Sequence, residues 1–204
     1  MRLFASSSRI AVLVIGIVLI LDQASKFWVK TNMQLSEEIP IFGDWFIIHF
    51  TENNGMAFGL EFAGEYGKLF LTLFRIIAVS LIGVYLFRMP KKGASKGLMA
   101  SGALIFAGAL GNIIDSVFYG VLFNDSYYQL ASFLPEEGGY SQLLFGKVVD
   151  MLYFPLYEGF LPQWVPFWGG DYFIFFRPVF NLADAAITTG VISILLFHRN
   201  FFKD

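Results

Sequence analysis

The stretch "RPVFNLADAAITTGVISILLFHR", residues 177–199, decides the fold. It is long and apolar enough to cross a bilayer, which takes about 20 mostly apolar residues. It also carries Asn181 and Asp184 near one end. Because a carboxylate at the bilayer centre costs about 2.5–3.5 kcal/mol even on the most lenient scale, an ionisable residue within a membrane segment indicates a functional site.

The rest of the chain has the composition of a membrane protein. Of its 204 residues, 56% are hydrophobic and 19% aromatic, and the hydrophobic residues come in long blocks, unlike those of soluble domains. A net charge of −2 without a basic tract argues against a nucleic-acid partner. The absence of cysteine excludes disulfides, thiolate metal sites and a cysteine nucleophile. We expect one integral membrane domain over residues 1–204.

The fold class that we predict is an α-helical polytopic membrane protein with four transmembrane helices and a small β-sheet on the outer membrane surface. The first helix could instead be a cleaved signal peptide, since Arg2 and Arg9 precede its apolar run. However, no A-x-A-like cleavage site follows, which favours an uncleaved anchor. The four predicted spans cover residues 9–30, 68–89, 97–120 and 178–197.

Basic residues predict the orientation. They lie at the N-terminus, in the loop "RMPKKGASKG" (88–97) and in the C-terminal tail, where Asp204 is the one acid. By the positive-inside rule, both termini are then cytoplasmic. The two long connections, 31–67 and 121–177, are expected outside. The basic residues are Arg2, Arg9, Arg88, Lys91, Lys92, Lys96, Arg199 and Lys203.

The outer connections contain β-prone runs. Residues 46–51 are followed by turn chemistry at Asn53-Asn54-Gly55, and "LLFGKVVDMLYF" (143–154) and "DYFIFF" (171–176) are also β-prone. Tryptophans in these connections suit the headgroup region of a membrane. They are Trp45, Trp164 and Trp168.

Polar residues at membrane depth recur in pairs. Asp22 and Lys26 are four residues apart and share a helix face, and an Asn-x-x-Asp pattern occurs at 112–115 and again at 181–184. Asp22 and Lys26 could be only an interfacial ion pair, and the asparagines could only join helices. Three carboxylates at similar depth would repel one another unless a shared proton or a cation intervenes. These three are Asp115, Asp150 and Asp184.

Several chemistries are disfavoured. The two histidines, His49 and His198, are predicted on opposite sides of the membrane, so we expect no metal site and no cofactor. No G-x-S-x-G motif is present, and Ser25 and Lys26 are adjacent and point to different helix faces. Two carboxylates that share one proton remain, which is the arrangement of an aspartic peptidase.

Five motifs resemble those of the bacterial lipoprotein signal peptidase family, also called signal peptidase II. They occur in order along nearly the whole chain: "DQASK" (22–26), "NNGMAFG" (53–59), "GNIID" (111–115), "VVDML" (148–152) and "FNLADAAI" (180–187). The resemblance implies an inner-membrane aspartic endopeptidase with its site near the periplasmic face. It also implies cleavage just before the diacylglyceryl-modified cysteine of a prolipoprotein, contact with membrane lipids and sensitivity to globomycin-type cyclic peptides.

The resemblance also assigns roles. It makes Asp150 and Asp184 the catalytic pair, whereas spacing alone does not choose Asp150 over Asp115. The supporting or substrate-binding residues that it implies are Asp115, Asn112 and Asn181 around the dyad or substrate backbone, Asn54 and Gly55 in the outer sheet, and Asp22 and Lys26 in a structural or lipid-facing role.

The chain departs from the family pattern in two ways. Ser116 stands where the family usually has arginine, which questions any cation next to Asp115. The stretches 120–146 and 155–176 are longer than expected. Two other functions remain open, a small proton- or ion-coupled transporter that uses the same carboxylates and a non-catalytic assembly factor. The clustering of the acids at one membrane face disfavours the transporter.

Overall fold

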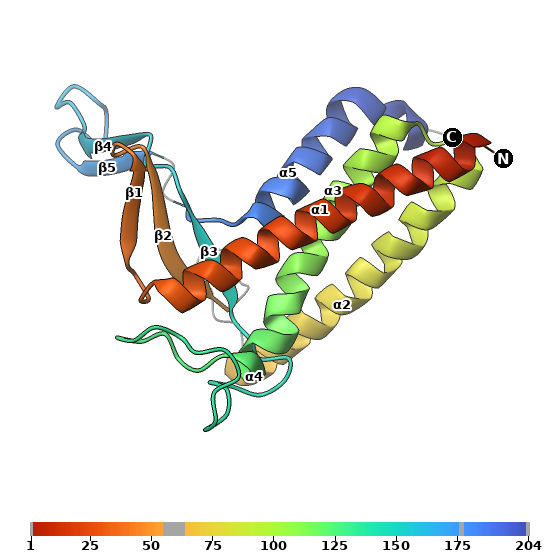
Figure 1. Cartoon of the computed structure of the whole chain (residues 1–204). Coiled ribbons are helices and arrows are strands. Elements are labelled where there is room, and N and C mark those ends of the chain that lie inside the picture. Colours follow the sequence, from red (N-terminus) through yellow and green to blue (C-terminus); the bar gives the residue numbers. More distant parts are fainter. Residues whose placement is uncertain (1, 55–63, 176–177, 203–204) are drawn as a thin grey trace.

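The computed structural model describes residues 2–54, 64–175 and 178–202. Figure 1 shows a helical bundle with strands at one end and both termini at the other. The helices are α1 (Arg2–Asn32), α2 (Gly64–Arg88), α3 (Lys96–Ile114), α4 (Gly120–Leu122) and α5 (Leu182–Ser193). The strands are β1 (Glu38–Phe42), β2 (Phe46–Asn53), β3 (Val148–Tyr153), β4 (Tyr157–Phe160) and β5 (Tyr172–Phe175).

Four helical segments of the described chain are long and apolar enough to cross a membrane, as the sequence predicts. They cover Ser7–Asn32, Tyr66–Lys92, Lys96–Leu122 and Leu182–Phe201. The third and fourth continue α3 and α5 through a π-helical turn each, Asp115–Tyr119 and Ile194–His198.

The start of the last helix differs from the prediction. The sequence places it at residue 178, but α5 begins at Leu182, because Asn181 has an extended backbone (φ −122°, ψ 178°) and caps the helix. The carboxylate of Asp184 therefore lies in the first helical turn.

Close packing joins α3 to α5 through glycines. A Cβ atom added to Gly108 of α3 would lie 2.2 Å from the carbonyl oxygen of Ala183. A Cβ atom on Gly190 of α5 would lie 2.6 Å from the carbonyl oxygen of Ser101. Small residues at such interfaces let two helix backbones approach closely in a membrane. α3 also packs against α1 and α2, so it is the central helix of the bundle (Figure 1).

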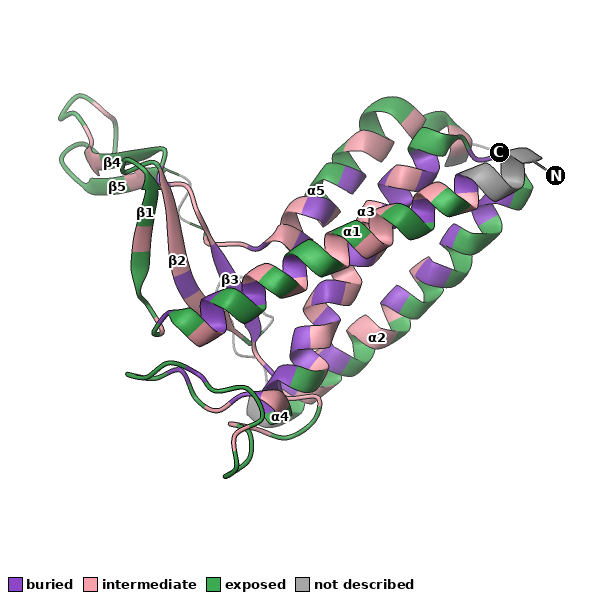
Figure 2. Cartoon of the chain, viewed as in Figure 1, coloured by how far each residue is buried: buried purple, intermediate pink, exposed green. Residues whose placement is uncertain are grey.

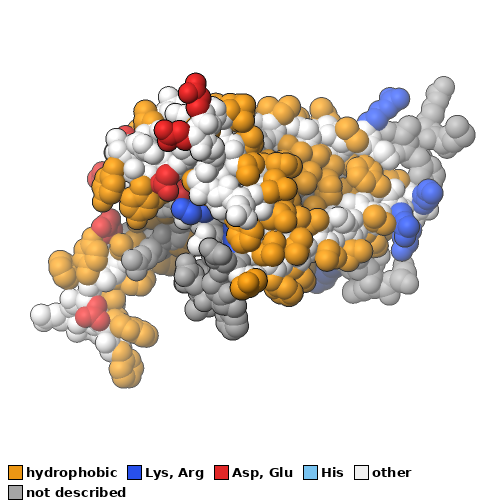
Figure 3. Space-filling model, turned by 90° about the horizontal axis from the view of Figure 1, so that it is seen from below, with side chains coloured by type: hydrophobic (Ala, Val, Ile, Leu, Met, Phe, Trp, Pro, Cys, Tyr) orange, Lys and Arg blue, Asp and Glu red, His pale blue; other side chains and the backbone are white. Residues whose placement is uncertain are grey.

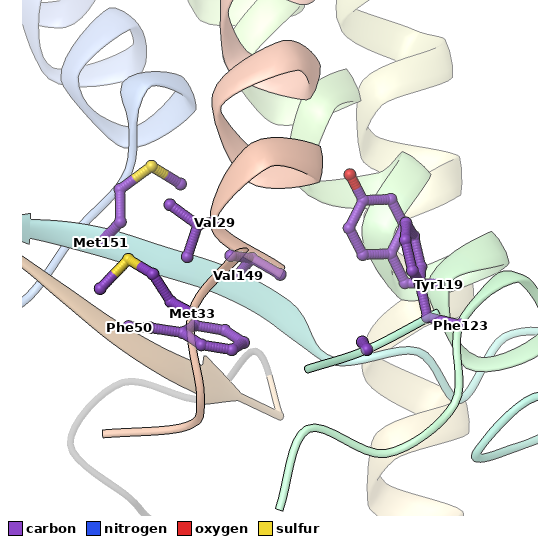
Figure 4. Packing of buried hydrophobic residues seen from close by; sticks show 8 residues of the cluster. Val29, Met33, Phe50, Tyr119, Phe123, Val149 and Met151 are labelled. Carbon is purple, nitrogen blue, oxygen red and sulfur yellow. The ribbon is translucent and has the colours of Figure 1, made fainter. Parts of the chain in front are cut away.

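An antiparallel three-stranded sheet, in the order β1-β2-β3, covers one end of the bundle. This confirms the strands predicted at 46–51 and within 143–154. Its register places Thr51 opposite Asp150. A cluster of buried apolar side chains fixes the sheet to the end of α1 (Figure 4). The cluster includes Val29, Met33, Phe50, Val149 and Met151.

A second, two-stranded sheet of β4 and β5 confirms the strand predicted within 171–176. It belongs to an arm, residues 155–175, that projects sideways from the strand end of the bundle (Figure 1). The arm carries mostly exposed residues, whereas β3 and the facing sides of the helices are buried (Figure 2).

Charge separates the two ends of the molecule. Figure 3 shows Lys and Arg side chains at the end that carries the termini, Asp and Glu side chains toward the strand end with a basic side chain beside them, and hydrophobic side chains over the helices between the two ends.

Candidate active site

Asp184 is built into the start of α5. Its backbone N–H donates to Oδ1 of Asn181 (2.9 Å), and its Oδ2 accepts from the backbone N–H of Asn181 (3.3 Å). This reciprocal capping box satisfies two helix N–H groups that lack intrahelical partners. A carboxylate in the first turn also interacts favourably with the helix dipole. The membrane helix accepts Asp184 because its position gives it these partners.

Asp150 lies within β3 and is 4% exposed. Nδ2 of Asn181 donates to its Oδ1 over 2.7 Å, and Nδ2 of Asn53 donates to its Oδ2 over 3.3 Å. Asn181 therefore contacts Asp150 through its side-chain amide and Asp184 through its backbone. One residue brings together the two carboxylates that the resemblance assigns to catalysis.

Asn112 of α3 completes the polar cluster. Its Nδ2 donates to Oδ1 of Asp184 over 2.8 Å. Its Oδ1 accepts from Nδ2 of Asn181 over 3.1 Å and from Nζ of Lys26 over 2.9 Å. The two donors at this oxygen orient the amide so that its N–H group faces the carboxylate.

The environment of Asp150 favours its protonated form. Burial, and after it the nearby negative charge of Asp184, raise the pKa of its carboxyl group to about 7. Hydrogen bonds from Asn53 and Asn181 and the charge of Lys26 oppose this rise in pKa. The outcome is a carboxyl group that can carry a proton near neutral pH.

A buried ion network supports the cluster from α1 and α3. Nζ of Lys26 lies 3.0 Å from Oδ2 of Asp22 and 2.8 Å from Oδ2 of Asp115, and all three side chains are 0% exposed. Both carboxylates also reach a backbone N–H group. Asp115 Oδ2, the oxygen that faces Lys26, accepts from Val149 N–H (3.3 Å), and Asp22 Oδ1 accepts from Ala183 N–H (3.0 Å). The network thus holds the residue that precedes each member of the Asp150–Asp184 pair.

This network bears on three expectations. The sequence requires a shared proton or a cation between carboxylates at similar depth, and Lys26 supplies the cation for Asp115. The lipid-facing alternative for Asp22 and Lys26 is wrong, because both side chains are fully buried. The cation next to Asp115, questioned because of Ser116, comes from α1 instead, and Ser116 donates its hydroxyl to the carbonyl of Asn112 (3.0 Å).

The outer motif contributes Asn53, which reaches Asp150. The role expected for Asn54 beside the substrate stays a prediction. The side chain of Asn54 is exposed, and its carbonyl oxygen accepts from Nζ of Lys68 over 2.9 Å. The alternation of a strand could have indicated this, because Asn53 shares a strand face with Thr51, the residue opposite Asp150. Gly55 lies outside the described residues.

Two more residues escaped the sequence analysis. Gln23 donates from Nε2 to Oδ1 of Asp115 (2.9 Å) and to Oδ2 of Asp22 (3.1 Å). Arg75, half-buried on α2, interacts electrostatically with Asp184 and Asp150. Gln23 lies within the "DQASK" motif, but no role for it followed from the sequence, and Arg75 lies in no pattern that indicates a site. Within residues 2–54, 64–175 and 178–202, no group of three or more His, Cys, Asp or Glu side chains could hold a metal ion.

Comparisons with known proteins agree with this geometry. The family model described as signal peptidase (SPase) II matches residues 14–200. A lipoprotein signal peptidase of Porphyromonas gingivalis is 47% identical over 189 residues, which cover 92% of this chain and 82% of that protein. The lipoprotein signal peptidase of Amoebophilus asiaticus is 42% identical over 186 residues, covering 90% of this chain and 75% of that one.

A solved structure shares the fold. It is a bacterial membrane enzyme determined by the in meso method at 1.9 Å resolution, with a TM-score of 0.59 and 26% sequence identity. The match covers 95% of this chain and 93% of that one. Since the family model spans nearly all of the residues that build the polar cluster and its supports, the chain belongs to the signal peptidase II family.

Proposed function

We propose that the chain removes signal peptides from diacylglyceryl-modified prolipoproteins, cutting just before the modified cysteine, with Asp150 and Asp184 as the catalytic dyad. Membership of the signal peptidase II family makes it a multi-pass membrane enzyme of the aspartic peptidase type. The observation that carries the assignment of the dyad is the bridge through Asn181, which contacts both carboxylates.

The reaction begins with a singly protonated pair. Asp150, with its raised pKa, carries the proton, and Asp184 accepts a proton from a water molecule. The water oxygen bonds to the scissile carbonyl carbon while Asp150 protonates the carbonyl oxygen, which gives a neutral gem-diol. The C–N bond then breaks, Asp184 returns its proton to the leaving nitrogen, and a gem-diol hydroxyl returns its proton to Asp150.

The supporting residues have separate tasks in this proposal. Asn112 and Asn181 hold the dyad by their amides, and the Asp22–Lys26–Asp115 network holds the backbone on either side. Asn54 and Gly55 belong to the outer segment that we expect beside the substrate. Compounds that place a hydroxyl group between the carboxylates should inhibit as mimics of the gem-diol, and globomycin-type cyclic peptides are expected inhibitors.

The proposed location is the bacterial inner membrane, with both termini in the cytoplasm and the dyad near the periplasmic face. The distribution of charge supports this orientation, because Lys and Arg gather at the end of the bundle that carries the termini. The dyad lies at the other end, where β3 meets the start of α5.

The test is cleavage of a purified prolipoprotein by the reconstituted enzyme. Asp150→Asn and Asp184→Asn should each abolish cleavage while the protein stays folded in detergent. Asp44→Asn, at an exposed acid in the β1–β2 turn, is the matched control and should cleave normally. Substantial turnover by either folded dyad variant would exclude the assignment. A proton or ion flux that disappears in the dyad variants, without any cleavage by the wild type, would favour the transporter.

A further inference from the structure

The arm of residues 155–175 has an unusually aromatic exposed surface. Eight of its 21 residues are aromatic, and it has two acids and no lysine or arginine. All eight aromatic side chains are exposed, and Phe167 is 95% exposed. Contiguous apolar surface of this kind marks an interaction site rather than ordinary exposed residues. The aromatic residues are Tyr157, Phe160, Trp164, Phe167, Trp168, Tyr172, Phe173 and Phe175.

The arm is rooted at the strand end of the membrane helices. In sequence, the arm follows β3 and precedes α5, so it lies in the segment that connects Asp150 to Asp184. At the root, the backbones of Leu152 and Phe180 exchange hydrogen bonds of 2.7 and 3.0 Å, and the rings of Phe154 and Phe180 stack at 5.8 Å. From this level the arm extends sideways, beyond the bundle (Figure 1).

The two faces of its hairpin differ. Tyr157 pairs with Phe175 and Gly159 with Phe173, so one face carries only aromatic side chains. The other face holds the pairs Glu158–Ile174 and Phe160–Tyr172, and the hydroxyl of Tyr172 donates to Glu158. Both faces are therefore largely apolar, and they differ in that the one carboxylate of the hairpin lies on the second face.

The tip, residues 161–171, satisfies part of its own backbone. Leu161 N–H donates to the carbonyl of Asp171 (2.9 Å), and Gly170 N–H donates to the carbonyl of Leu161 (2.9 Å). Gly169 N–H donates to Val165 (3.0 Å), and two prolines of the tip have no N–H to satisfy. These bonds lower the cost of moving the tip out of water, because an apolar environment offers no partners for backbone polar groups. The remaining N–H groups of the tip require the water that the membrane interface still contains.

We propose that this arm lies in the outer interface of the lipid bilayer, with the face of Tyr157, Phe173 and Phe175 toward the lipid. Tryptophan and tyrosine are enriched at that depth, because their rings are apolar and their N–H and O–H groups are polar. The apolar surface of the arm continues that of the membrane helices, which favours lipid over a protein partner. The arm starts where the lipid-facing surface of the helices ends, and Figure 3 shows hydrophobic side chains on both.

Fluorescence quenching in vesicles tests the proposal without reference to catalysis. The full-length variant Trp28→Phe/Trp45→Phe keeps only Trp164 and Trp168, and Trp164→Phe/Trp168→Phe is its matched counterpart. Both are reconstituted in phosphatidylcholine vesicles with brominated acyl chains. Interfacial segments are buried about 5–10 Å into the headgroup–acyl boundary, so bromine should at least about halve the emission of the arm tryptophans.

The opposite result is equally clear. Quenching by aqueous acrylamide as strong as for free tryptophan, without quenching by bromolipid, would overturn the proposal. Quenching by neither agent would also overturn it, since a protein partner or a second copy of the chain would then cover the arm.

A second pair of variants tests which face of the β4–β5 hairpin lies toward the lipid. In a background with all four tryptophans changed to Phe, Phe173→Trp and Ile174→Trp place one reporter on each face of β5. The emission of the first should fall with bromolipid and that of the second with acrylamide. An identical response of both reporters would contradict the proposed orientation. The proposed cleavage reaction could be disproved without any change in these results.

Discussion

At the scale of single residues, the protonation of Asp150 determines how the proposed reaction depends on pH. Burial and the charge of Asp184 raise its pKa to about 7. Asp150 is thus protonated below neutral pH and loses its proton as the pH rises through that range. Cleavage should fall on the alkaline side for this reason, and on the acid side once the pair as a whole carries two protons.

The measurement is a pH–rate profile in vesicles, with and without EDTA. We expect an alkaline limb close to neutral pH and the same profile in the chelator. Loss of activity in EDTA that zinc restores would replace the two-carboxylate mechanism with a metallopeptidase mechanism.

Asn53 should tune that alkaline limb. Its hydrogen bond to Oδ2 favours the ionised form of Asp150 and so lowers the pKa of this carboxyl group. Asn53→Ala removes the bond, so the pKa of Asp150 should rise and the alkaline limb should move to higher pH. Asn54→Ala, the adjacent control, keeps the backbone carbonyl that Lys68 binds and should leave the limb in place. The same shift in both variants would contradict this role for Asn53.

At the scale of elements, the contact between α3 and α5 sets the position of Asp184. Gly108→Ala places a methyl group against the carbonyl of Ala183, which would push the start of α5 away from α3. Overpacking of this kind typically costs about 1–3 kcal/mol. We expect a lower denaturation midpoint in detergent and reduced cleavage. Gly16→Ala on α1, where a Cβ atom would meet nothing within 4 Å, is the control. Equal effects of the two changes would exclude the packing explanation.

The ion network between α1 and α3 makes a second prediction at this scale. Lys26→Met leaves the carboxylates of Asp22 and Asp115 buried without their cation. Removing one partner of a buried ion pair typically destabilises a protein by about 3–5 kcal/mol. Thermal denaturation in detergent should show a large loss, and the triple variant Asp22→Asn/Lys26→Met/Asp115→Asn should recover much of it. A triple variant no more stable than Lys26→Met would argue against the electrostatic cause.

The sequence predicted the elements better than the contacts between them. Blocks of apolar residues identified the four spans, and β-prone runs identified β2, β3 and β5, because both signals are local. The i,i+4 spacing of Asp22 and Lys26 left their ion pair open as one alternative, and the structure contains it. It could not show that Lys26 also reaches Asp115, because that contact depends on how α1 is rotated against α3.

The candidate site shows the same limit. Spacing could not distinguish Asp115 from Asp150, and the resemblance supplied the choice. The structure offers a physical distinction, since Asp115 has a lysine cation and Asp150 is held by two asparagine amides. The start of α5 was missed because Asn181 looks like a helical residue in an apolar run and acts as a cap only in its extended conformation.

At the scale of the whole molecule, the proposed dyad lies at the strand end of the bundle, where the arm and the sheet meet the membrane helices. In the proposed reaction, the substrate cysteine carries diacylglycerol, and its two acyl chains hold it at the lipid–water interface. Burial contributes about 0.8 kcal/mol per CH₂ only for chains that start in water, whereas these chains start in the bilayer. The lipid should therefore act mainly by placing the scissile bond at the level of the dyad.

Orientation of this kind lowers the entropic part of the barrier, so removal of the diacylglyceryl group should slow cleavage even when the signal peptide still spans the membrane. The measurement compares two peptides in the same vesicles, identical except for the lipid on the cysteine and present at equal membrane density. We expect a large loss in kcat/KM for the unmodified peptide. Raising the amount of unmodified peptide in the membrane until as much of it is bound to the enzyme should not restore the rate. Equal rates would contradict this prediction. They would mean that the helix of the signal peptide alone sets the position of the scissile bond along the membrane normal. The interface at the strand end would then not select the lipidated cysteine.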